Sequence, residues 1–208
     1  MPRIFVIRHP ETEANVERRY VGRTDSQWTE RGREQAKAIH AFVHGLDPDV
    51  VLSSPSQRAL KAAHVATPCA VPLRVVEELR EIDFGAAEGL TFDEARVLGL
   101  AMRYLPSTPQ KGAAAPLPDA SGEIAPGGET WSEFIARIDF VRRELLGIDG
   151  TVCAFTHGGA GRALVAALLS LPPEAMWSFA LPTGGVAEIV ADDERATLVR
   201  LFSPLQEE

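Results

Sequence analysis

The sequence is poor in cysteine, in dense basic runs and in long hydrophobic stretches, and each shortage excludes a class of protein. Only two cysteines, Cys69 and Cys153, occur among 208 residues, so a disulfide framework is not expected and a reducing compartment is favoured. The net charge is −8 and lysine and arginine form no dense run, which argues against a nucleic-acid partner or an acidic membrane surface. The longest apolar stretch, residues 163–171, is far shorter than a membrane span, and no secretory signal is evident, so we expect a cytoplasmic protein.

What is present is the composition of one globular domain. Hydrophobic residues make up 45% of the chain and charged residues 24%, both ordinary values. A chain of this length is below the size at which a core usually divides, so residues 1–208 are predicted to form a single domain. Short apolar runs at residues 4–7, 50–52 and 152–155 are typical of strands that are buried on both faces of a parallel sheet.

Further strands and the helices between them complete the predicted architecture. Strands are expected at residues 73–77, 185–190 and 197–202, with the last two forming a hairpin. Helix starts are marked by capping residues, namely Thr29, Thr91 and Thr130, the last two with a glutamate three residues later. The alternation of strands and helices predicts an α/β protein, a three-layer α/β/α sandwich with a largely parallel central sheet.

Three predicted strands lead into residues that are suited to bind and attack a phosphoryl group. The first strand ends at Arg8 and His9, a later strand ends at His157, and a third precedes a helix that begins near Arg58. Open α/β sheets place their chemistry at the carboxyl ends of the strands. Guanidinium groups neutralise phosphate oxygens, and a neutral imidazole can attack phosphorus. The two histidines and two arginines therefore predict a phosphoryl site.

Ordered sequence motifs run through nearly the whole chain. They begin with Arg8-His9-Pro10-Glu11-Thr12-Glu13-Ala14-Asn15 and continue with Tyr20-Val21-Gly22-Arg23-Thr24-Asp25, Thr29-Glu30-Arg31-Gly32, Ser53-Ser54-Pro55 with Arg58, Leu79-Arg80-Glu81-Ile82-Asp83-Phe84-Gly85, Pro126-Gly127-Gly128-Glu129 and Thr156-His157-Gly158. In this order and spacing they resemble the histidine phosphatase superfamily, the phosphoglycerate mutase-like enzymes. An Arg-His dipeptide alone is weak evidence, whereas the ordered set is specific.

The resemblance implies a phosphatase that acts on a small phosphorylated metabolite and needs neither a metal nor an organic cofactor. It implies that His9 becomes a phosphohistidine and that Glu81 donates and then accepts a proton, with Arg8, Arg58 and His157 completing the catalytic set. The implied substrate-binding residues are Arg8, Asn15, Gly22, Arg58, His157 and Gly158. Composition and motifs are compatible with a homodimer.

Three positions that differ from the pattern of the family or of its mutases keep alternative functions open. The phosphoglycerate mutases typically carry Trp before the Asn of the first motif and Arg after the acidic Glu, where this chain has Ala14 and Ile82. Phosphoglycerate mutase-type transfer is therefore the second hypothesis, behind a phosphatase that resembles the α-ribazole and broad-specificity branches. The family usually has glycine after the nucleophilic histidine, but this chain has Pro10, which lacks a backbone N–H. A catalytically weak binding or regulatory module is the third hypothesis.

One long segment lacks a clear secondary-structure pattern. Residues 106–128 contain five prolines and a run of small residues, and a loop of this length inside a domain is usually functional or disordered. The resemblance implies that an insert around residues 91–128 forms a cap near the substrate. A solvated insert without a role is the alternative.

Overall fold

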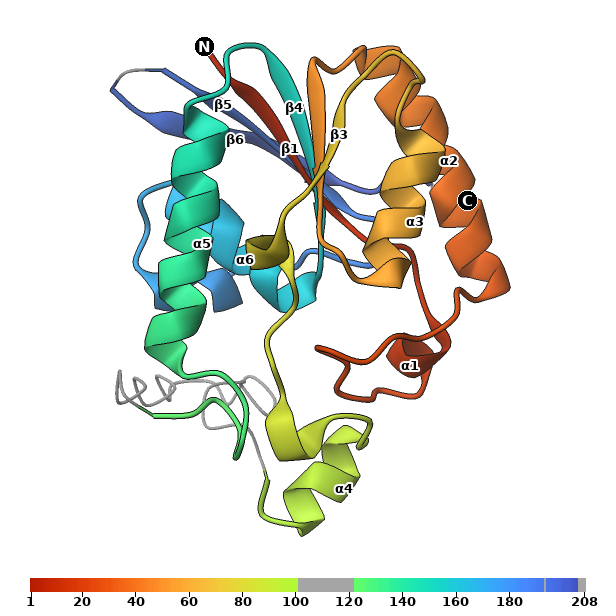
Figure 1. Cartoon of the computed structure of the whole chain (residues 1–208), viewed down its shortest axis with the longest axis vertical. Helices are drawn as coiled ribbons and strands as arrows, with labels where there is room; N and C mark the ends of the chain where they lie inside the picture. Colours follow the sequence, from red (N-terminus) through yellow and green to blue (C-terminus); the bar gives the residue numbers. More distant parts are fainter. Residues whose placement is uncertain (101–121, 193, 206–208) are drawn as a thin grey trace.

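A computed structural model describes residues 1–100, 122–192 and 194–205 of the chain. Strands and helices alternate along these residues (Figure 1). In chain order the elements are β1 (Arg3–Arg8), α1 (Glu13–Val16), α2 (Glu30–Leu46), β2 (Val50–Ser53), α3 (Gln57–Ala66), β3 (Leu73–Val75), the 3₁₀ helices η1 (Glu77–Leu79) and η2 (Gly85–Ala87), α4 (Phe92–Val97), α5 (Trp131–Leu146), β4 (Thr151–Thr156), α6 (Gly158–Leu168), η3 (Pro173–Trp177), β5 (Val186–Ala191) and β6 (Ala196–Phe202).

The six strands form one mixed sheet in the order β3-β2-β4-β1-β5-β6. The first four of these strands run parallel to one another, while β5 and β6 are antiparallel to their neighbours. β4 lies between β1 and β2 in the sheet, although in the chain β1 ends at Arg8, β2 ends at Ser53 and β4 begins only at Thr151. The carboxyl ends of β1, β2 and β4 consequently meet at one edge of the sheet, below the strands in Figure 1.

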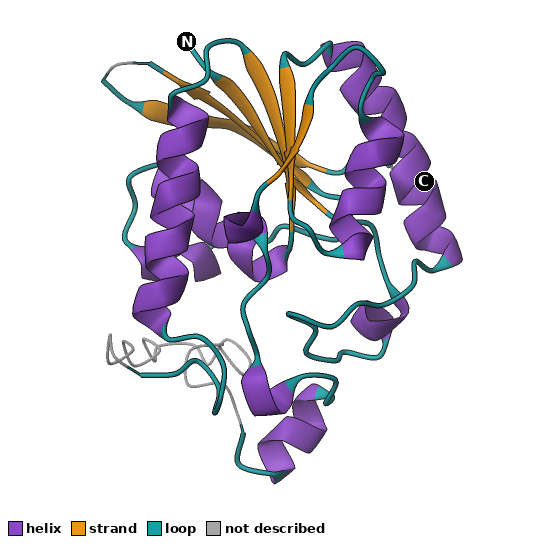
Figure 2. Cartoon of the chain, in the orientation of Figure 1, coloured by secondary structure: helices purple, strands orange, loops and turns teal. Residues whose placement is uncertain are grey.

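Helices cover both faces of the sheet (Figures 1 and 2). Side chains of β1 alternate between the faces, so that Phe5 packs in one apolar cluster with α2 and α3 and Val6 in another with α5 and α6. The helices present matching stripes, such as Ile39 of α2 and Phe134 of α5, both almost fully buried. The predicted three-layer α/β/α sandwich with a largely parallel sheet is thereby confirmed.

The predicted strands match the observed ones to within one residue at each end, except at one boundary. The strand that was expected at residues 73–77 ends at Val75, and Glu77 begins a 3₁₀ helix instead. This strand lies at the sheet edge and is largely exposed, whereas Leu79 is completely buried. The chain therefore turns inward after Val76 to place Leu79 in the core. The predicted hairpin is present as β5 and β6, with a bulge at Glu188.

The insert around residues 91–128 is described only at its ends. Thr91 caps α4 with the reciprocal hydrogen bonds of a capping box, and residues 122–128 lead into α5. Residues 101–121 lie outside the described part of the chain, so the cap stays a prediction. Among helices formed by the described residues, none is long and apolar enough to cross a membrane.

Candidate active site

The register of the central strands brings two histidines to one edge of the sheet. β1 and β4 run parallel with Arg8 opposite Thr156, so the residues that follow them, His9 and His157, are neighbours. Their ring centroids lie 5.2 Å apart. Both residues are buried, with 3% and 0% of their surface exposed. The structure thus brings together the two histidines that the sequence singled out.

A backbone carbonyl determines which nitrogen of His9 carries a proton. Nδ1 of His9 lies 2.7 Å from the carbonyl oxygen of Pro10, and a carbonyl oxygen can only accept, so Nδ1 is protonated. Burial, followed by the cations of Arg58 and Arg8, lowers the pKa of His9 well below its ordinary value. The ring is therefore neutral near pH 7, and the lone pair of Nε2 is free to act as a nucleophile.

Two buried nitrogens at this edge have no hydrogen-bond partner within the described residues. They are Nδ1 of His157 and Nε of Arg8. The other ring nitrogen of His157, Nε2, lies 2.8 Å from the hydroxyl of Ser54, and Nη1 of Arg8 donates to the carbonyl of Leu181 at 2.8 Å. A buried polar group without a partner is unfavourable. The oxygens of an anionic group would provide acceptors for both nitrogens.

Arg58 lies in the first turn of α3 and is enclosed by the loop that precedes α2. Its guanidinium donates to the Asp25 carboxylate at 3.1 Å and to three backbone carbonyls, those of Val21, Gly22 and Thr24, at 3.0, 3.1 and 2.7 Å. After burial, the charge of Arg58 is the largest influence that lowers the pKa of both His9 and His157. Arg58 therefore holds the loop and also adds positive charge to the site.

Positive charge exceeds negative charge around the two imidazoles. Burial lowers the pKa of Arg8 to about 10, which the charge of Glu81 opposes, so Arg8 is still cationic near pH 7. Arg162 of α6 contributes a further cation that interacts with both Arg8 and Glu81. Arg8, Arg58 and Arg162 thus all interact with Glu81, while Arg58 is also paired with Asp25. This local excess is what a dianionic substrate requires in a chain whose net charge is −8.

Glu81 binds the amino end of α6 rather than facing solvent. Its carboxylate accepts hydrogen bonds from the backbone of Gly159 and Ala160, both at 2.9 Å, and from Ile82 at 3.0 Å. Only 8% of its surface is exposed. A β-carbon at position 159 would lie 2.6 Å from Oε1 of Glu81, so glycine is needed for this close approach. The carboxylate is held beside His157, which caps the same helix.

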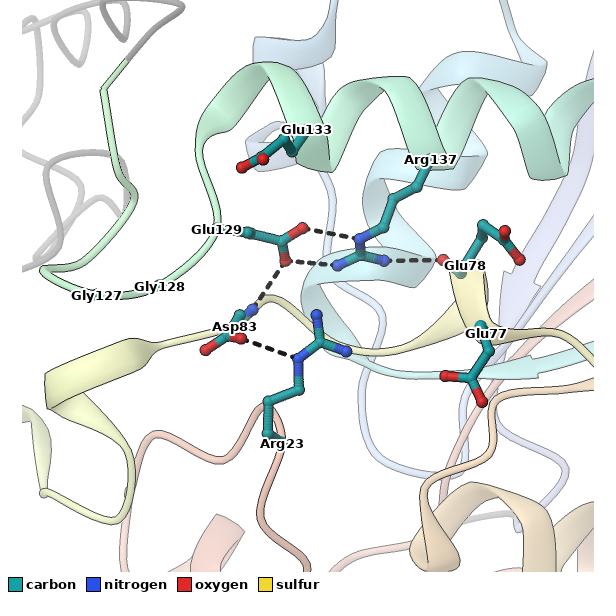
Figure 3. Close-up of a pocket in the computed structure, with 9 residues that line it drawn as sticks. All are labelled: Arg23, Glu77, Glu78, Asp83, Gly127, Gly128, Glu129, Glu133 and Arg137. Atoms are coloured by element: carbon teal, nitrogen blue, oxygen red, sulfur yellow. Dashed lines mark hydrogen bonds and ion pairs between the residues drawn. The ribbon is translucent and has the colours of Figure 1, made fainter.

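Arg137 of α5 holds the loop that carries Glu81, and Figure 3 shows its contacts with Glu78 and Glu129. Its guanidinium donates to three carbonyls of that loop, those of Glu78, Arg80 and Glu81, at 2.8, 2.7 and 3.1 Å. Glu129 binds the same guanidinium with both carboxylate oxygens and accepts from the backbone of Asp83 at 2.8 Å. The two ends of the Glu81 segment are therefore fixed by one buried ion pair.

A cavity of about 610 Å³ lies beside the ion pair of Arg137 and Glu129 (Figure 3). The residues that line it carry five carboxylates and two guanidinium groups and include neither histidine: Arg23, Glu77, Glu78, Asp83, Gly127, Gly128, Glu129, Glu133 and Arg137. Such an acidic lining repels phosphate. The cavity is therefore distinct from the phosphoryl site formed by the strand ends.

The remaining predicted contacts are placed as follows. The side-chain oxygen of Asn15 accepts from the backbone and the hydroxyl of Thr12 at 3.1 and 3.0 Å, which leaves the amide nitrogen as the group able to contact a substrate. The backbone amide of Gly22 donates to the carboxylate of Glu88 at 3.0 and 3.2 Å. Gly158 begins α6 against the guanidinium of Arg8, where a β-carbon would be 3.0 Å from Cζ.

Three residues that organise this site were not assigned from the sequence. Ser54 contacts His157, Arg137 fixes the Glu81 loop, and Glu88 accepts hydrogen bonds from residues 22–24. Ser54 and Glu88 lie within or beside the quoted motifs, so proximity to a motif was the available signal. The contact of Arg137 with the Glu81 loop had no local signal, because the partners there are backbone carbonyls about fifty-five to sixty residues earlier.

The sequence that forms this arrangement of two neighbouring histidines and buried arginines matches a known family. The model of the histidine phosphatase superfamily (branch 1) matches residues 4–204. The chain belongs to this superfamily. As a member of it, the protein is an enzyme, a phosphoric monoester hydrolase.

Relatives within the superfamily carry different substrate names. The adenosylcobalamin/alpha-ribazole phosphatase of Escherichia coli K12 is 31% identical over 202 residues, which cover 94% of this chain and 93% of that protein. A 2,3-bisphosphoglycerate-dependent phosphoglycerate mutase of Novosphingobium aromaticivorans is 28% identical, with 97% and 98% covered. The crystal structure of the alpha-ribazole phosphatase from Shigella flexneri has a TM-score of 0.80 at 28% identity and covers 97% of this chain and 96% of that one.

Proposed function

We propose that the enzyme hydrolyses a small-molecule phosphomonoester through a phosphohistidine on His9. One observation carries the proposal. The Nδ1 proton of His9 is bound by the Pro10 carbonyl, which leaves Nε2 as a neutral nucleophile next to two buried nitrogens, Nε of Arg8 and Nδ1 of His157, that have no partner in the described part of the chain. A phosphoryl group provides oxygens that can pair with such nitrogens and the electrophile that Nε2 attacks.

The proposed reaction has two displacements at phosphorus. In the first, Nε2 of His9 forms a bond to phosphorus while the ester oxygen leaves and takes a proton from the Glu81 carboxyl. In the second, Glu81 removes a proton from water, and the resulting oxygen displaces His9 to release inorganic phosphate. Arg8, Arg58 and His157 stabilise the phosphoryl oxygens in both steps. Arg137 binds the backbone carbonyl of Glu81, and the start of α6 binds its carboxylate. This fixed position supports the role of Glu81 as proton donor and acceptor.

We propose that the substrate is a small phosphorylated metabolite and that α-ribazole phosphate belongs in the first set to be tested. The support is the alpha-ribazole phosphatase name of the relatives reported above. Phosphoglycerate mutase activity has less support, because Ala14 and Ile82 depart from the mutase pattern. A screen of metabolite phosphates that measures released phosphate, together with interconversion of 3- and 2-phosphoglycerate, distinguishes the two activities.

Trapping of the phosphoenzyme tests the mechanism. Acid-labile, base-stable phosphate should accumulate on the wild-type protein in quenched reactions and be absent from His9→Ala. His64→Ala is the matched control, because His64 is an exposed histidine in the last turn of α3, and it should be phosphorylated like the wild type. Wild-type turnover by His9→Ala would contradict the proposal. A protein that binds phosphate without hydrolysing any ester would favour the third hypothesis, a catalytically weak binding or regulatory module.

A further inference from the structure

The second histidine of the site, His157, has a single contact that can decide where its proton resides. Burial, and then the cations of Arg58 and other neighbours, lowers the pKa of His157 well below its ordinary value. A neutral imidazole carries one proton, on either Nδ1 or Nε2. Nε2 lies 2.8 Å from Oγ of Ser54, whereas Nδ1 has no partner among the described residues. The hydroxyl of Ser54 is thus the group that distinguishes the two tautomers.

The contacts of Ser54 favour donation from its hydroxyl to Nε2. Oγ of Ser54 accepts from the backbone amide of Ser56 at 3.3 Å, and its hydroxyl can donate either to Oγ of Ser56 at 3.4 Å or to Nε2 of His157 at 2.8 Å. The contact with His157 is the shortest of the three. Donation of the single hydroxyl proton to Nε2 therefore gives the strongest hydrogen bond that Ser54 can donate. With that proton pointing at Nε2, the ring proton must be on Nδ1.

The backbone fixes the two side chains in register. Ser54 follows β2, and its amide donates to the carbonyl of Phe155 at 2.9 Å, two residues before His157 in β4. Ser54 and His157 are both fully buried, so water does not compete for the contact. The hydroxyl therefore has one well-defined position relative to the imidazole.

We propose that Ser54 is a positioning residue that holds neutral His157 in its Nδ1–H tautomer, so that His157 donates a hydrogen bond to the phosphoryl group. The opposite tautomer would direct a lone pair at phosphoryl oxygens, which is repulsive. The proposal rests on the role of His157 in the proposed function, but the tautomer itself is a property of the resting enzyme. It can be measured without any turnover.

Magnetic resonance of isotope-labelled histidine tests the tautomer directly. In the resting wild-type enzyme near pH 7, the ring-nitrogen signals of His157, assigned by comparison with His157→Asn, should show a protonated Nδ1 and an unprotonated Nε2. In Ser54→Ala the proton should redistribute between the two nitrogens. A protonated Nε2 in the wild type, or an unchanged tautomer in Ser54→Ala, would overturn the proposal. If the tautomer behaves as expected but no phosphoenzyme forms, the proposed function fails while the role of Ser54 stands.

Kinetics separate tautomer control from simple packing. Ser54→Ala should lower kcat by about tenfold, because a donor is lost in the transition state, and it should do so for activated and poor leaving groups alike. The matched control is Ser53→Ala, which removes an equally buried hydroxyl whose hydrogen bond among the described residues is to the backbone carbonyl of Ser54. In a His157→Asn background, which has no tautomers, Ser54→Ala should have little further effect. Equal losses in Ser53→Ala and Ser54→Ala, or full additivity with His157→Asn, would refute the inference.

Discussion

The carboxylate of Glu129 and the guanidinium of Arg137 form a two-point ion pair, with Oε1 at 2.7 Å from Nη2 and Oε2 at 2.8 Å from Nε. Their side chains are only 8% and 14% exposed. The pair spans the loop of Pro126-Gly127-Gly128 and helix α5, and its remaining hydrogen bonds go to the backbone around Glu81. The pair therefore links the packing of α5 to the position of Glu81, the proposed proton donor.

Removal of one partner of the pair should destabilise the protein markedly. Glu129→Gln leaves the Arg137 cation buried without its counter-charge, and such losses are about 3–5 kcal/mol. Unfolding in urea, followed by circular dichroism, measures the change. Glu133→Gln is the control, since Glu133 is an exposed carboxylate at the start of the same helix and its loss should cost about 1 kcal/mol or less. Equal stability of the two variants would contradict a structural role for the pair.

Glu81→Gln should affect substrates according to their leaving groups. Glutamine can keep contact with the start of α6 but cannot supply a proton, so esters with poor leaving groups should lose much more kcat than activated aryl phosphates, by about a hundredfold or more. Steady-state rates for a series of leaving groups give the comparison. A uniform loss across the series would show that Glu81 acts in binding and not in proton transfer.

Pro10→Gly should raise kcat/KM. If the glycine usual in the family contributes an amide to the phosphoryl oxygens, its recovery is worth about 1.5–3 kcal/mol, which corresponds to about ten- to a hundredfold in rate. The carbonyl of residue 10 would still accept from His9. Greater backbone freedom should lower the free energy of unfolding by about 0.4–1 kcal/mol. An unchanged or lower kcat/KM would mean that position 10 gives no amide to the substrate. It would also remove the support for the hypothesis of a catalytically weak binding or regulatory module.

Acid should destabilise the fold through its two buried imidazoles. The folded-state pKa values of His9 and His157 are depressed, so below the unfolded value near 6.5 the unfolded chain binds more protons than the folded one. The stabilising effect of neutral histidine is complete above that pH and declines as the pH falls toward the folded-state values, by up to about 1.4 kcal/mol per pH unit for each ring. Urea unfolding at several pH values measures the slope.

Replacement of the two rings identifies the source of this slope. His9→Asn and His157→Asn should each flatten the dependence of stability on pH between about 6.5 and 5. His64→Gln, which changes an exposed histidine of α3, should leave it as in the wild type. A slope that persists in the double variant of His9 and His157 would assign the pH dependence to other groups.

The parts of the site that the sequence predicted are those encoded locally. Arg8, His9 and His157 stand directly after apolar runs, and a run buried on both faces of a parallel sheet has its carboxyl end at a shared edge. The pattern therefore predicts convergence without any knowledge of the register. The same local logic failed at residues 76–77, where burial of Leu79 outweighed the continuation of an edge strand.

The supporting contacts could not be predicted because they join a side chain to distant backbone. The partners of Arg137 in the loop of Glu81 are carbonyls, which every residue has, so no side-chain pattern marks them. Glu88 likewise accepts from backbone amides of the loop around Gly22. The role of Ser54 depends on an interatomic distance across two strands, which residue types alone do not fix.

The position of β4 between β1 and β2 has a consequence for synthesis of the chain. Until residue 156 has left the ribosome, β1 and β2 lack the strand that joins them, and both expose an unpaired inner edge. The nascent protein therefore passes through a long interval in which two apolar strands can pair with other chains, and insertion of β4 is a slow, non-local step. His157 follows β4 directly, so a form in which β4 has not yet joined the sheet lacks the second histidine of the candidate site.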